Sequence, residues 1–188
     1  MTVAVLALQG AFAEHEKVLR TLGEECFEIR QAADLKKSFD GLVLPGGEST
    51  VMGKLLHELD LFNPLKEKIE EGLPVLATCA GLILLASKLE DDDTVWFGTL
   101  PITVRRNAFG RQLGSFHTRL NYGDLGQIPM TFIRAPVITK VSPEVKILAR
   151  DGDNIYAVQY KNQTALAFHP ELDESMAVHS DFLKQVHS

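Results

Sequence analysis

The chain has 188 residues, of which 45% are hydrophobic and 23% are charged, a composition typical of a soluble globular protein long enough to bury a core. Its 19 basic and 25 acidic residues give a net charge of −6, which argues against a nucleic-acid or membrane partner because both select basic surfaces. Two cysteines far apart, Cys26 and Cys79, form neither a disulfide framework nor a metal cluster, and we expect a cytoplasmic protein.

Short apolar runs alternate with helical patterns through the first half of the chain. The apolar run VAVLAL is typical of a strand buried on both faces. Predicted strands are VAVLAL (3–8), ECFEI (25–29), GLVLPGG (41–47), which ends in a loop, and VLAT (75–78). Predicted helices are 12–22, 52–59, 64–71 and 80–89. This alternation indicates a mostly parallel sheet with helices on both faces.

The second half of the chain changes to closely spaced strands. Candidates are PITVRR (101–106), FHTRLNY (116–122), TFIRAP (131–136), VKILAR (145–150), NIYAVQY (154–160) and TALAFHP (164–170). Turns between these runs predict hairpins, and a last helix is expected from about 175 to 186. Because no repeat, linker or change in composition divides the chain, we expect residues 1–188 to form a single three-layer α/β domain with an added antiparallel section.

Cys79 follows a predicted strand, at the position where parallel sheets gather ligands and chemistry. Its small neighbours Ala77, Ala80 and Gly81 permit a tight strand-to-helix turn of the nucleophile-elbow kind. In such a turn the first helical amides stabilise a thiolate, and the N–H of Ala80 is placed to donate to an oxyanion. A packed core thiol is the competing interpretation, which we keep for Cys26.

His169 lies at the end of another predicted strand, in AFHPEL. Pro170 favours extended backbone at His169, and residues i and i+2 of an extended segment project to the same side. Glu171 is therefore placed to orient the imidazole of His169. A cysteine, a base and a carboxylate are the parts of a nucleophilic triad. A surface turn would also explain His-Pro-Glu, so this motif alone leaves both interpretations open.

The other histidines give weaker signals. His57, His179 and His187 lie on polar helix faces or near the chain end, where we expect them to be solvated. The positions of His15 and His117 are compatible with a cleft, although nothing in the sequence requires one. None of the five is assigned a role.

The segment LPGGEST (44–50) follows a buried strand. Gly46 and Gly47 permit close approach to a ligand or a positive φ. The segment is not a P-loop, because the lysine and its spacing are missing. A strand-to-helix turn with Ser49 or Thr50 as N-cap is the alternative interpretation.

Two segments place arginines among apolar residues: RRNAFGRQ (105–112) and FIRAP (132–136). A guanidinium group in a cleft usually has an anionic partner, and a carboxylate bound through two hydrogen bonds is the natural one. Whether that carboxylate belongs to a ligand or to the protein itself stays open at this point.

Together these motifs resemble the class I (triad) glutamine amidotransferases, through TCAG, HPE and PGGE. A closer resemblance is to the glutaminase subunits of pyridoxal 5′-phosphate synthase, the PdxT family. It rests on LALQGAFAEH (6–15), LVLPGGESTVM (42–52), ATCAGLILLA (77–86), RRNAFGRQ (105–112), FIRAP (132–136) and AFHPEL (167–172). These motifs occur in family order across nearly the whole chain.

The resemblance implies a flavodoxin-like sheet and hydrolysis of L-glutamine to L-glutamate and ammonia, with no cofactor and no metal. Carried over to this sequence, Cys79 is the nucleophile that forms a γ-glutamyl thioester. His169 is the general base and then the acid that protonates the leaving ammonia, and Glu171 orients it.

Glutamine-binding positions are also implied by the resemblance. They are Gly46, Gly47, Glu48, Arg106, Ile133 and Arg134. The oxyanion hole corresponds to Gly47 and Ala80, with Gln9 close to it in a placement that depends on the synthase partner in the family. Two positions depart from the family pattern: Ala77 replaces a glycine common in amidotransferase elbows, and Arg105 stands where relatives often carry glutamate.

The chemistry of ammonia predicts a partner. Ammonia released into neutral water becomes mostly ammonium, which is no nucleophile, so a biosynthetic glutaminase must pass ammonia directly to a synthase. The resemblance implies a PdxS-like barrel subunit that makes pyridoxal 5′-phosphate from ribose 5-phosphate and glyceraldehyde 3-phosphate, in a 12+12 complex. Completion of the oxyanion hole on docking predicts little glutaminase activity for the chain alone.

Two other functions remain compatible with the sequence. One is a stand-alone γ-glutamyl cysteine hydrolase, which would act without a partner. The other is a non-catalytic α/β domain that uses Cys79 as a thiol sensor. Glutamine turnover with and without a synthase separates the first from the amidotransferase subunit, and ammonia release by Cys79→Ala and His169→Asn tests the second.

Overall fold

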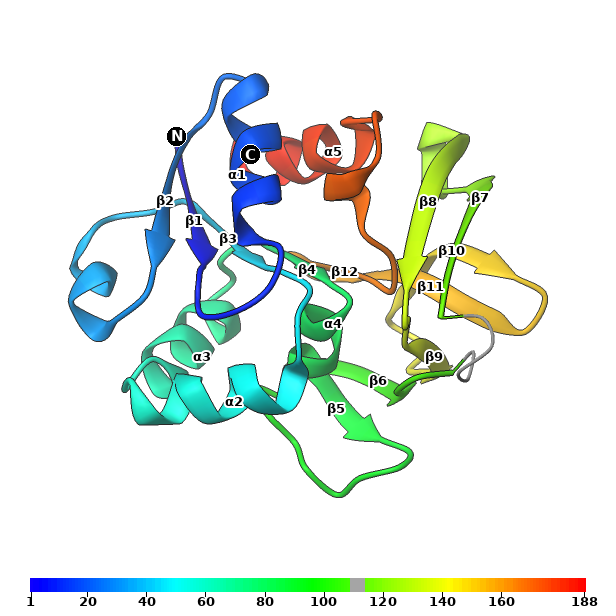
Figure 1. Cartoon of the computed structure of the whole chain (residues 1–188), viewed down its shortest axis with the longest axis horizontal. Helices are drawn as coiled ribbons and strands as arrows, with labels where there is room; N and C mark the ends of the chain where they lie inside the picture. Colours follow the sequence, from blue (N-terminus) through cyan, green and yellow to red (C-terminus); the bar gives the residue numbers. More distant parts are fainter. Residues whose placement is uncertain (109–113) are drawn as a thin grey trace.

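A central sheet separates two layers of helices in the computed structural model, which describes residues 1–108 and 114–188 (Figure 1). Within these residues the sheet has ten strands, in the order β2-β1-β3-β4-β12-β11-β9-β6-β5, with β10 paired to β11. The strands are β1 (Thr2–Leu6), β2 (Glu25–Ile29), β3 (Gly41–Leu44), β4 (Val75–Thr78), β5 (Ala86–Leu89), β6 (Leu100–Arg105), β9 (Val137–Val141), β10 (Lys146–Asp151), β11 (Asn154–Tyr160) and β12 (Gln163–Leu166). Positions 109–112 of the motif RRNAFGRQ lie outside the described residues.

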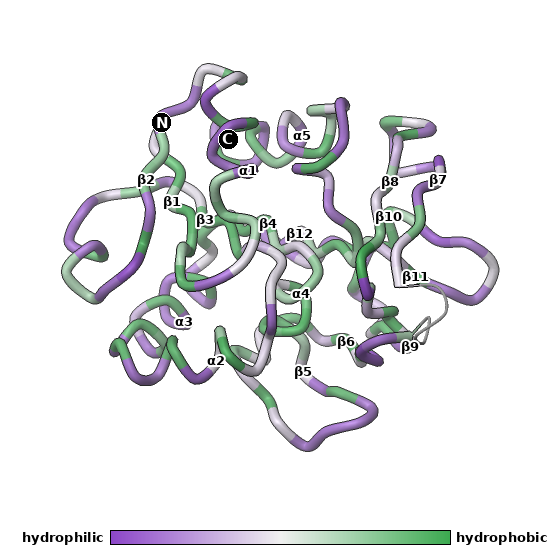
Figure 2. Tube along the Cα trace, in the orientation of Figure 1, coloured by the Kyte–Doolittle hydropathy of each residue, from purple (hydrophilic) through white to green (hydrophobic). Residues whose placement is uncertain are grey.

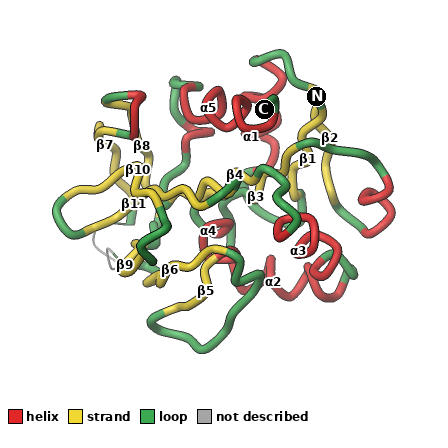
Figure 3. The backbone as a smooth tube through the Cα atoms, turned by 180° about the vertical axis from the view of Figure 1, so that it is seen from behind, coloured by secondary structure: helices red, strands yellow, loops and turns green. Residues whose placement is uncertain are grey.

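Helices cover both faces of this sheet. They are α1 (Phe12–Thr21), α2 (Ser49–Glu58), α3 (Phe62–Glu70), α4 (Ala80–Leu85) and α5 (Ala177–Val186), with short 3-10 turns η1 (Ala32–Lys36), η2 (Gly123–Leu125) and η3 (Pro170–Leu172). The view from behind shows α1 and α5 on one face and α2, α3 and α4 on the other (Figure 3). The predicted three-layer α/β architecture is thus confirmed. No helix in the described part of the chain is long and apolar enough to cross a bilayer.

The parallel half of the sheet contains the most deeply buried strands. β1, β3, β4 and β12 run parallel to one another, and every residue of β3, β4 and β12 is buried. Hydrophobic residues follow these strands through the middle of the molecule (Figure 2). Burial of each Val or Leu side chain here contributes about 1.5–3 kcal/mol. Because the four strands are parallel, their carboxyl ends meet at one edge of the layer.

The other half of the sheet is antiparallel where β9, β10, β11 and β12 pair. A separate two-stranded ribbon, β7 (Ser115–Asn121) with β8 (Gln127–Ile133), stands beside this half (Figure 1). Its end matters for the site, because the N–H of His169 donates to the carbonyl of Thr131 in β8 at 2.8 Å. The predicted antiparallel section is therefore present and contacts the parallel half.

Two local predictions about the elements were wrong or incomplete. The helix predicted for 80–89 ends at Leu85, and Ala86–Leu89 form β5. These four residues pair with β6, and the hydroxyl of Ser87 donates to the carbonyl of Ile102 at 3.1 Å, so sheet pairing overrides a local sequence that is compatible with a helix. The strand β9 (Val137–Val141) was not predicted, although its β-branched residues are typical of a strand.

Candidate active site

Cys79 occupies a strained turn between β4 and α4. Its φ is +47° and its ψ is −98°, a conformation that costs a non-glycine residue about 1–3 kcal/mol. Backbone contacts hold the turn: the N–H of Cys79 donates to Leu166 at 2.8 Å, and its carbonyl accepts from Ile83 at 3.3 Å. The predicted strand-to-helix turn is therefore present, and its strain is typical of a functional position.

Small residues on both sides make this turn possible. A Cβ on Gly81 would lie 2.1 Å from the carbonyl oxygen of Leu44 in β3, so only glycine lets the start of α4 pack this closely against the sheet. Ala77, which replaces the glycine common in related elbows, lies inside β4 and is fully buried. It needs no glycine-like backbone there.

His169 and Glu171 stand behind the cysteine. Nδ1 of His169 lies 2.7 Å from Oε1 of Glu171, and both residues are 7% exposed. Burial opposes a charge on the ring, but hydrogen bonds to Cys79 and Glu171 outweigh it and raise the pKa of His169 to about 10. The ring therefore faces the sulfur as a cation at neutral pH, which is the partner that a thiolate requires.

The backbone that joins these two residues differs from the prediction. Pro170–Leu172 form the 3-10 turn η3 rather than an extended segment. The carboxylate still reaches the imidazole, because the tight turn brings it back toward the ring. Burial opposes ionisation of Glu171, whereas His15 and His169 together hold the pKa of its carboxyl below the ordinary value.

The loop Gly46–Glu48 lies against Cys79 and His169. A Cβ on Gly46 would lie 2.3 Å from Cε1 of His169 and 3.4 Å from Cβ of Cys79, so the absent side chain leaves the room that His169 occupies. The carbonyl of Gly46 accepts from the N–H of Ala11 at 3.0 Å. Because the Gly46–Gly47 peptide is trans, the N–H of Gly47 points in the direction opposite to this carbonyl, away from Ala11.

Gln9 and Glu48 fix the second half of this loop. The N–H of Glu48 donates to Oε1 of Gln9 at 2.6 Å. The carboxylate of Glu48 caps α2, accepting from Thr50 at 3.0 Å and Val51 at 2.8 Å. Burial raises the pKa of this carboxyl, but the two backbone N–H groups outweigh that effect and lower it. The N-cap of α2 is thus Glu48 and not Ser49 or Thr50, the two candidates from the sequence.

These residues surround a cavity of about 500 Å³. Its lining includes Gln9, Gly46, Gly47, Glu48, Cys79, Arg106, Ile133, Arg134 and His169. Of the other predicted site residues, Glu171 lies behind His169, and Ala80 follows Cys79 at the start of α4. Nine residues chosen from the sequence therefore meet at one cavity. In the described ranges, no group of three or more His, Cys, Asp or Glu residues is arranged to hold a metal ion.

The partners of Arg105 and Arg106 answer, for the first of the two arginine segments, the question that the sequence left open. Nε of Arg106 lies 3.1 Å from Asp91, and Nη2 lies 3.1 Å from Asp92. Arg105 points elsewhere and pairs with Glu90 at 2.8 Å. Arg106 therefore has carboxylates of the protein as partners while it also lines the cavity.

Two histidines near Glu171 received no role from the sequence. His15 of α1 and His179 of α5 are fully buried, so the expectation that His179 is solvated was wrong. Nδ1 of His15 lies 2.9 Å from Nε2 of His179, and Nε2 of His15 lies 3.3 Å from Oε2 of Glu171. The spacing of His15 with Phe12 and Leu19 already placed it on the apolar face of its helix, which was the available signal.

Comparison with known proteins gives the family. The SNO glutamine amidotransferase family matches residues 5–188. The chain belongs to this family. A pyridoxal 5′-phosphate synthase subunit PdxT from Desulfitobacterium hafniense is 59% identical over 99% of this chain and 94% of the relative. A protein of the same name from Methanocorpusculum labreanum is 53% identical over 99% and 98%.

A solved structure agrees with this membership. The crystal structure of a glutamine amidotransferase superposes with a TM-score of 0.93 at 40% sequence identity, over 99% of both chains. The cavity at the carboxyl ends of β1, β3, β4 and β12 is thus built on a fold that a glutamine amidotransferase shares. Membership in the family makes Cys79 and His169 the first candidates for a nucleophile and its base.

Proposed function

We propose that this chain is the glutaminase subunit of a pyridoxal 5′-phosphate synthase, and that it hydrolyses L-glutamine to L-glutamate and ammonia at Cys79. The observation that carries the proposal is the cavity at which Cys79, His169 and the loop Gly46–Glu48 meet, with Glu171 behind the imidazole. A strained cysteine, a cationic imidazole and a buried carboxylate are what nucleophilic attack on a carboxamide requires.

The proposed reaction uses each of these groups in turn. The sulfur of Cys79 attacks the side-chain carbonyl carbon of glutamine, and the C–N bond breaks as His169 gives its proton to the leaving ammonia. A γ-glutamyl thioester remains on the sulfur. His169 then takes a proton from water, the hydroxide adds to the thioester carbon, and glutamate leaves as the thiolate is restored. Glu171 keeps the ring oriented and stabilises its positive charge throughout.

Backbone N–H groups are proposed to stabilise the oxyanion of each tetrahedral intermediate. Ala80 follows Cys79 at the start of α4, and Gly47 lines the same cavity as Cys79. One such donor contributes roughly 100- to 1,000-fold in kcat in enzymes of this kind. Gln9 holds the loop of Gly47 through its bond to the N–H of Glu48, so a movement of Gln9 on docking would act on this hole.

Recognition of glutamine is proposed to use the two arginines that line the cavity. Arg106 and Arg134 offer positive charge to the α-carboxylate, and Ile133 covers the aliphatic part of the substrate. Glu48 contributes through the loop, because its carboxylate is already engaged by α2. The fork of Arg106, held by Asp91 and Asp92, keeps a fixed direction while a ligand binds.

The partner and the setting complete the proposal. The relatives named above are synthase subunits, and we propose a PdxS-like barrel subunit as the acceptor of ammonia, in a 12+12 complex. Residues 1–188 act as one amidotransferase domain, supported by a family match across 5–188. A cytoplasmic setting is proposed because both cysteines, Cys26 and Cys79, are free thiols, as is usual in reducing compartments.

The proposal is tested by glutamate release from glutamine. The full chain is assayed alone and mixed with the cognate barrel subunit, with Cys79→Ala and His169→Asn as matched variants. We expect turnover that rises strongly in the mixture and falls to background in both variants. Equal turnover with and without the barrel subunit would favour a stand-alone hydrolase, and no turnover in either case would favour a thiol sensor.

A further inference from the structure

Behind the triad, a chain of buried side chains continues from Glu171 into the protein. Oε1 of Glu171 is taken by His169, whereas Oε2 is buried and accepts no hydrogen bond of good geometry from the described residues. The nitrogen next to this oxygen is Nε2 of His15, at 3.3 Å. A buried carboxylate oxygen needs a donor, so the proton on His15 decides whether this contact is favourable.

The contacts of His15 determine which of its nitrogens carries the proton. Its Nε2 faces Glu171 and lies 3.2 Å from the hydroxyl of Thr78. A carboxylate only accepts, so an unprotonated Nε2 would set a lone pair against a negative charge. With the proton on Nε2, this N–H donates to the hydroxyl of Thr78 and also lies 3.3 Å from the negative charge on Oε2 of Glu171, which it attracts. Nδ1 then becomes the acceptor for His179.

The contacts of His179, the last of these buried side chains, lead to the same position for the proton on His15. Its Nε2 lies 2.9 Å from Nδ1 of His15, and its own Nδ1 has no hydrogen-bond partner in the described part of the structure. If the proton were on Nδ1 of His179, a buried N–H would be left without an acceptor, which is the costlier arrangement. The proton therefore belongs on Nε2, from which it donates to His15.

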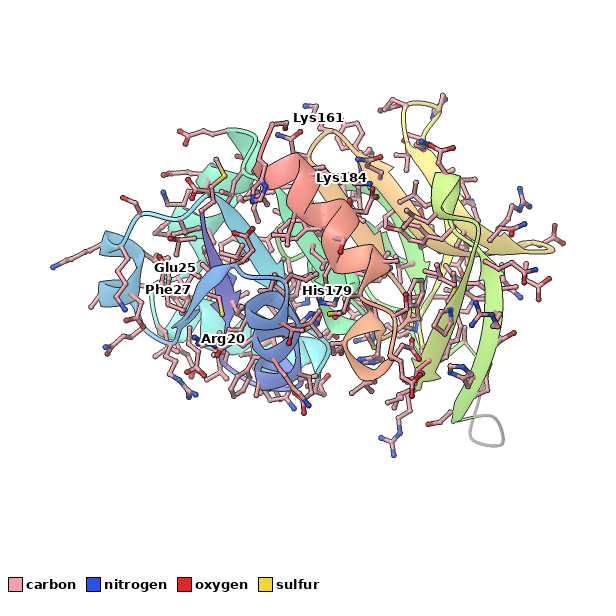
Figure 4. All side chains as sticks on the ribbon, turned by 90° about the horizontal axis from the view of Figure 1, so that it is seen from above. Arg20, Glu25, Phe27, Lys161, His179 and Lys184 are labelled. Atoms are coloured by element: carbon pink, nitrogen blue, oxygen red, sulfur yellow. The ribbon has the colours of Figure 1, made fainter. Side chains whose placement is uncertain are left out.

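Burial keeps both rings neutral, as this direction of hydrogen bonding from His179 to His15 requires. His15 faces Glu171, His169 and Glu14, and His179 faces His15 and Glu171. Loss of hydration outweighs Glu171 and Glu14 at His15, and Glu171 at His179, and it lowers the pKa of each ring, to about 3 for His179. Figure 4 shows His179 on α5, where this helix lies beside α1.

We propose that His15 is a positioning residue for the triad: its Nε2–H holds the second carboxylate oxygen of Glu171, and His179 fixes the tautomer of His15 that makes this possible. The inference rests on the proposed glutaminase function. Because one oxygen of the carboxylate bonds the ring of His169 and the other lies against the N–H of His15, the plane of the carboxylate is fixed relative to the ring of His169. Without His15, the carboxylate is free to turn, and the imidazole loses its alignment with Cys79.

A pair of variants separates positioning from mere filling of space. In His15→Asn, the amide replaces the ring atoms near His179 but does not reach Glu171. In His15→Gln, the longer side chain brings an amide N–H to the place of Nε2. For the chain in complex with its barrel subunit, we expect His15→Asn to lower kcat for glutamine about tenfold, with KM changed less than about twofold. His15→Gln should keep kcat within about threefold.

A double-mutant cycle adds a readout that a structural role would not move. Once Glu171→Gln has removed the carboxylate, adding His15→Asn should cause no further loss of kcat, because its target is gone. If the two losses multiply, or if His15→Asn has the kcat of the wild type, His15 does not act through Glu171 and the inference is wrong.

Folding and the dependence on the proposed function are controlled separately. If His15→Asn fails to fold, His179→Leu carries the test, since it removes the donor that fixes the tautomer; a folded His179→Leu with unchanged kcat overturns the inference. A wild-type complex that does not hydrolyse glutamine overturns the proposed function itself. An active wild type with unimpaired variants overturns only the role of His15.

Discussion

At the scale of single residues, the site depends on glycines, which leave space for neighbouring groups, as much as on its reactive side chains. Gly46 leaves the space that the imidazole of His169 fills, and Gly81 lets α4 begin against β3. Cys79 accepts a positive φ between them. The sulfur, the ring and the loop therefore have their places fixed by backbone packing before any substrate binds.

The first prediction concerns Gly46. Gly46→Ala puts a Cβ 2.3 Å from Cε1 of His169, so the ring must shift while the fold, held by the buried strands, is kept. We expect kcat for glutamine to fall at least about 100-fold. The matched control is Gly114→Ala, whose Cβ meets no atom of the residues that the structure describes within 4 Å; equal activity of the two variants would contradict the account.

The second prediction concerns the pH dependence of stability. The pKa of His179 falls from 6.5 to about 3 on folding, so the unfolded chain binds a proton below pH 6.5 that the folded chain does not. This contribution to stability is present above pH 6.5 and is lost as the pH falls toward 3. Between pH 6.5 and about 5, His179→Leu should lose free energy of unfolding less steeply than wild type, by up to about 1.4 kcal/mol per pH unit.

Urea unfolding of the two proteins at a series of pH values measures this difference. Contributions of titratable groups remote from His179 cancel in the comparison, because only one side chain changes. Two stability curves that stay parallel through this window would show that His179 is not buried in its neutral form.

That Cys79, His169 and Glu171 lie together was predictable from the sequence, whereas the buried residues that contact them from behind were not. Cys79, His169 and Glu171 stand in motifs at the ends of recognisable apolar runs. His179 lies on a helix of mixed polarity, and its burial follows from packing against α1, 164 residues away from His15 in sequence. A contact between residues this far apart in sequence cannot be inferred from the local pattern of apolar and polar residues.

At the scale of elements, the carboxyl ends of parallel strands bring the site together. Gln9 follows β1, the loop Gly46–Glu48 follows β3, Cys79 follows β4 and His169 follows β12. The parallel half was predictable because its strands are continuous apolar runs. The strand formed by Ala86–Leu89, where a helix was expected, was not predictable, because it depends on pairing with β6.

The third prediction uses two neighbouring arginines at the end of β6. Arg106→Lys keeps the charge at the cavity but loses the planar fork, so we expect KM for glutamine to rise about tenfold and kcat to change less than about threefold. Arg105→Lys is the matched control, because Arg105 is exposed and pairs with Glu90, and exposed ion pairs contribute little. Steady-state kinetics of both variants in the complex test this prediction. Equal KM values for Arg106→Lys and Arg105→Lys would exclude Arg106 from glutamine binding.

At the scale of the whole molecule, one sheet carries two kinds of structure. The parallel half supplies the loops of the site, and the antiparallel half with the β7–β8 ribbon supports the segment of His169 through Thr131. The three-layer class followed from the order of the predicted elements. The path of the sheet through β12, β11, β9 and β6 did not, because strand order in an antiparallel section depends on long-range pairing that the sequence pattern leaves open.

The central claim is that Cys79 frees the amide nitrogen of glutamine here and that a synthase partner uses it directly. The most direct measurement supplies the complex with glutamine labelled with ¹⁵N in its amide, together with unlabelled ammonium, and follows the label in pyridoxal 5′-phosphate. The account predicts a product with the undiluted enrichment of the amide, and an unlabelled product with Cys79→Ala. A product that carries the enrichment of the mixed ammonium pool, or label transferred by Cys79→Ala, would contradict it.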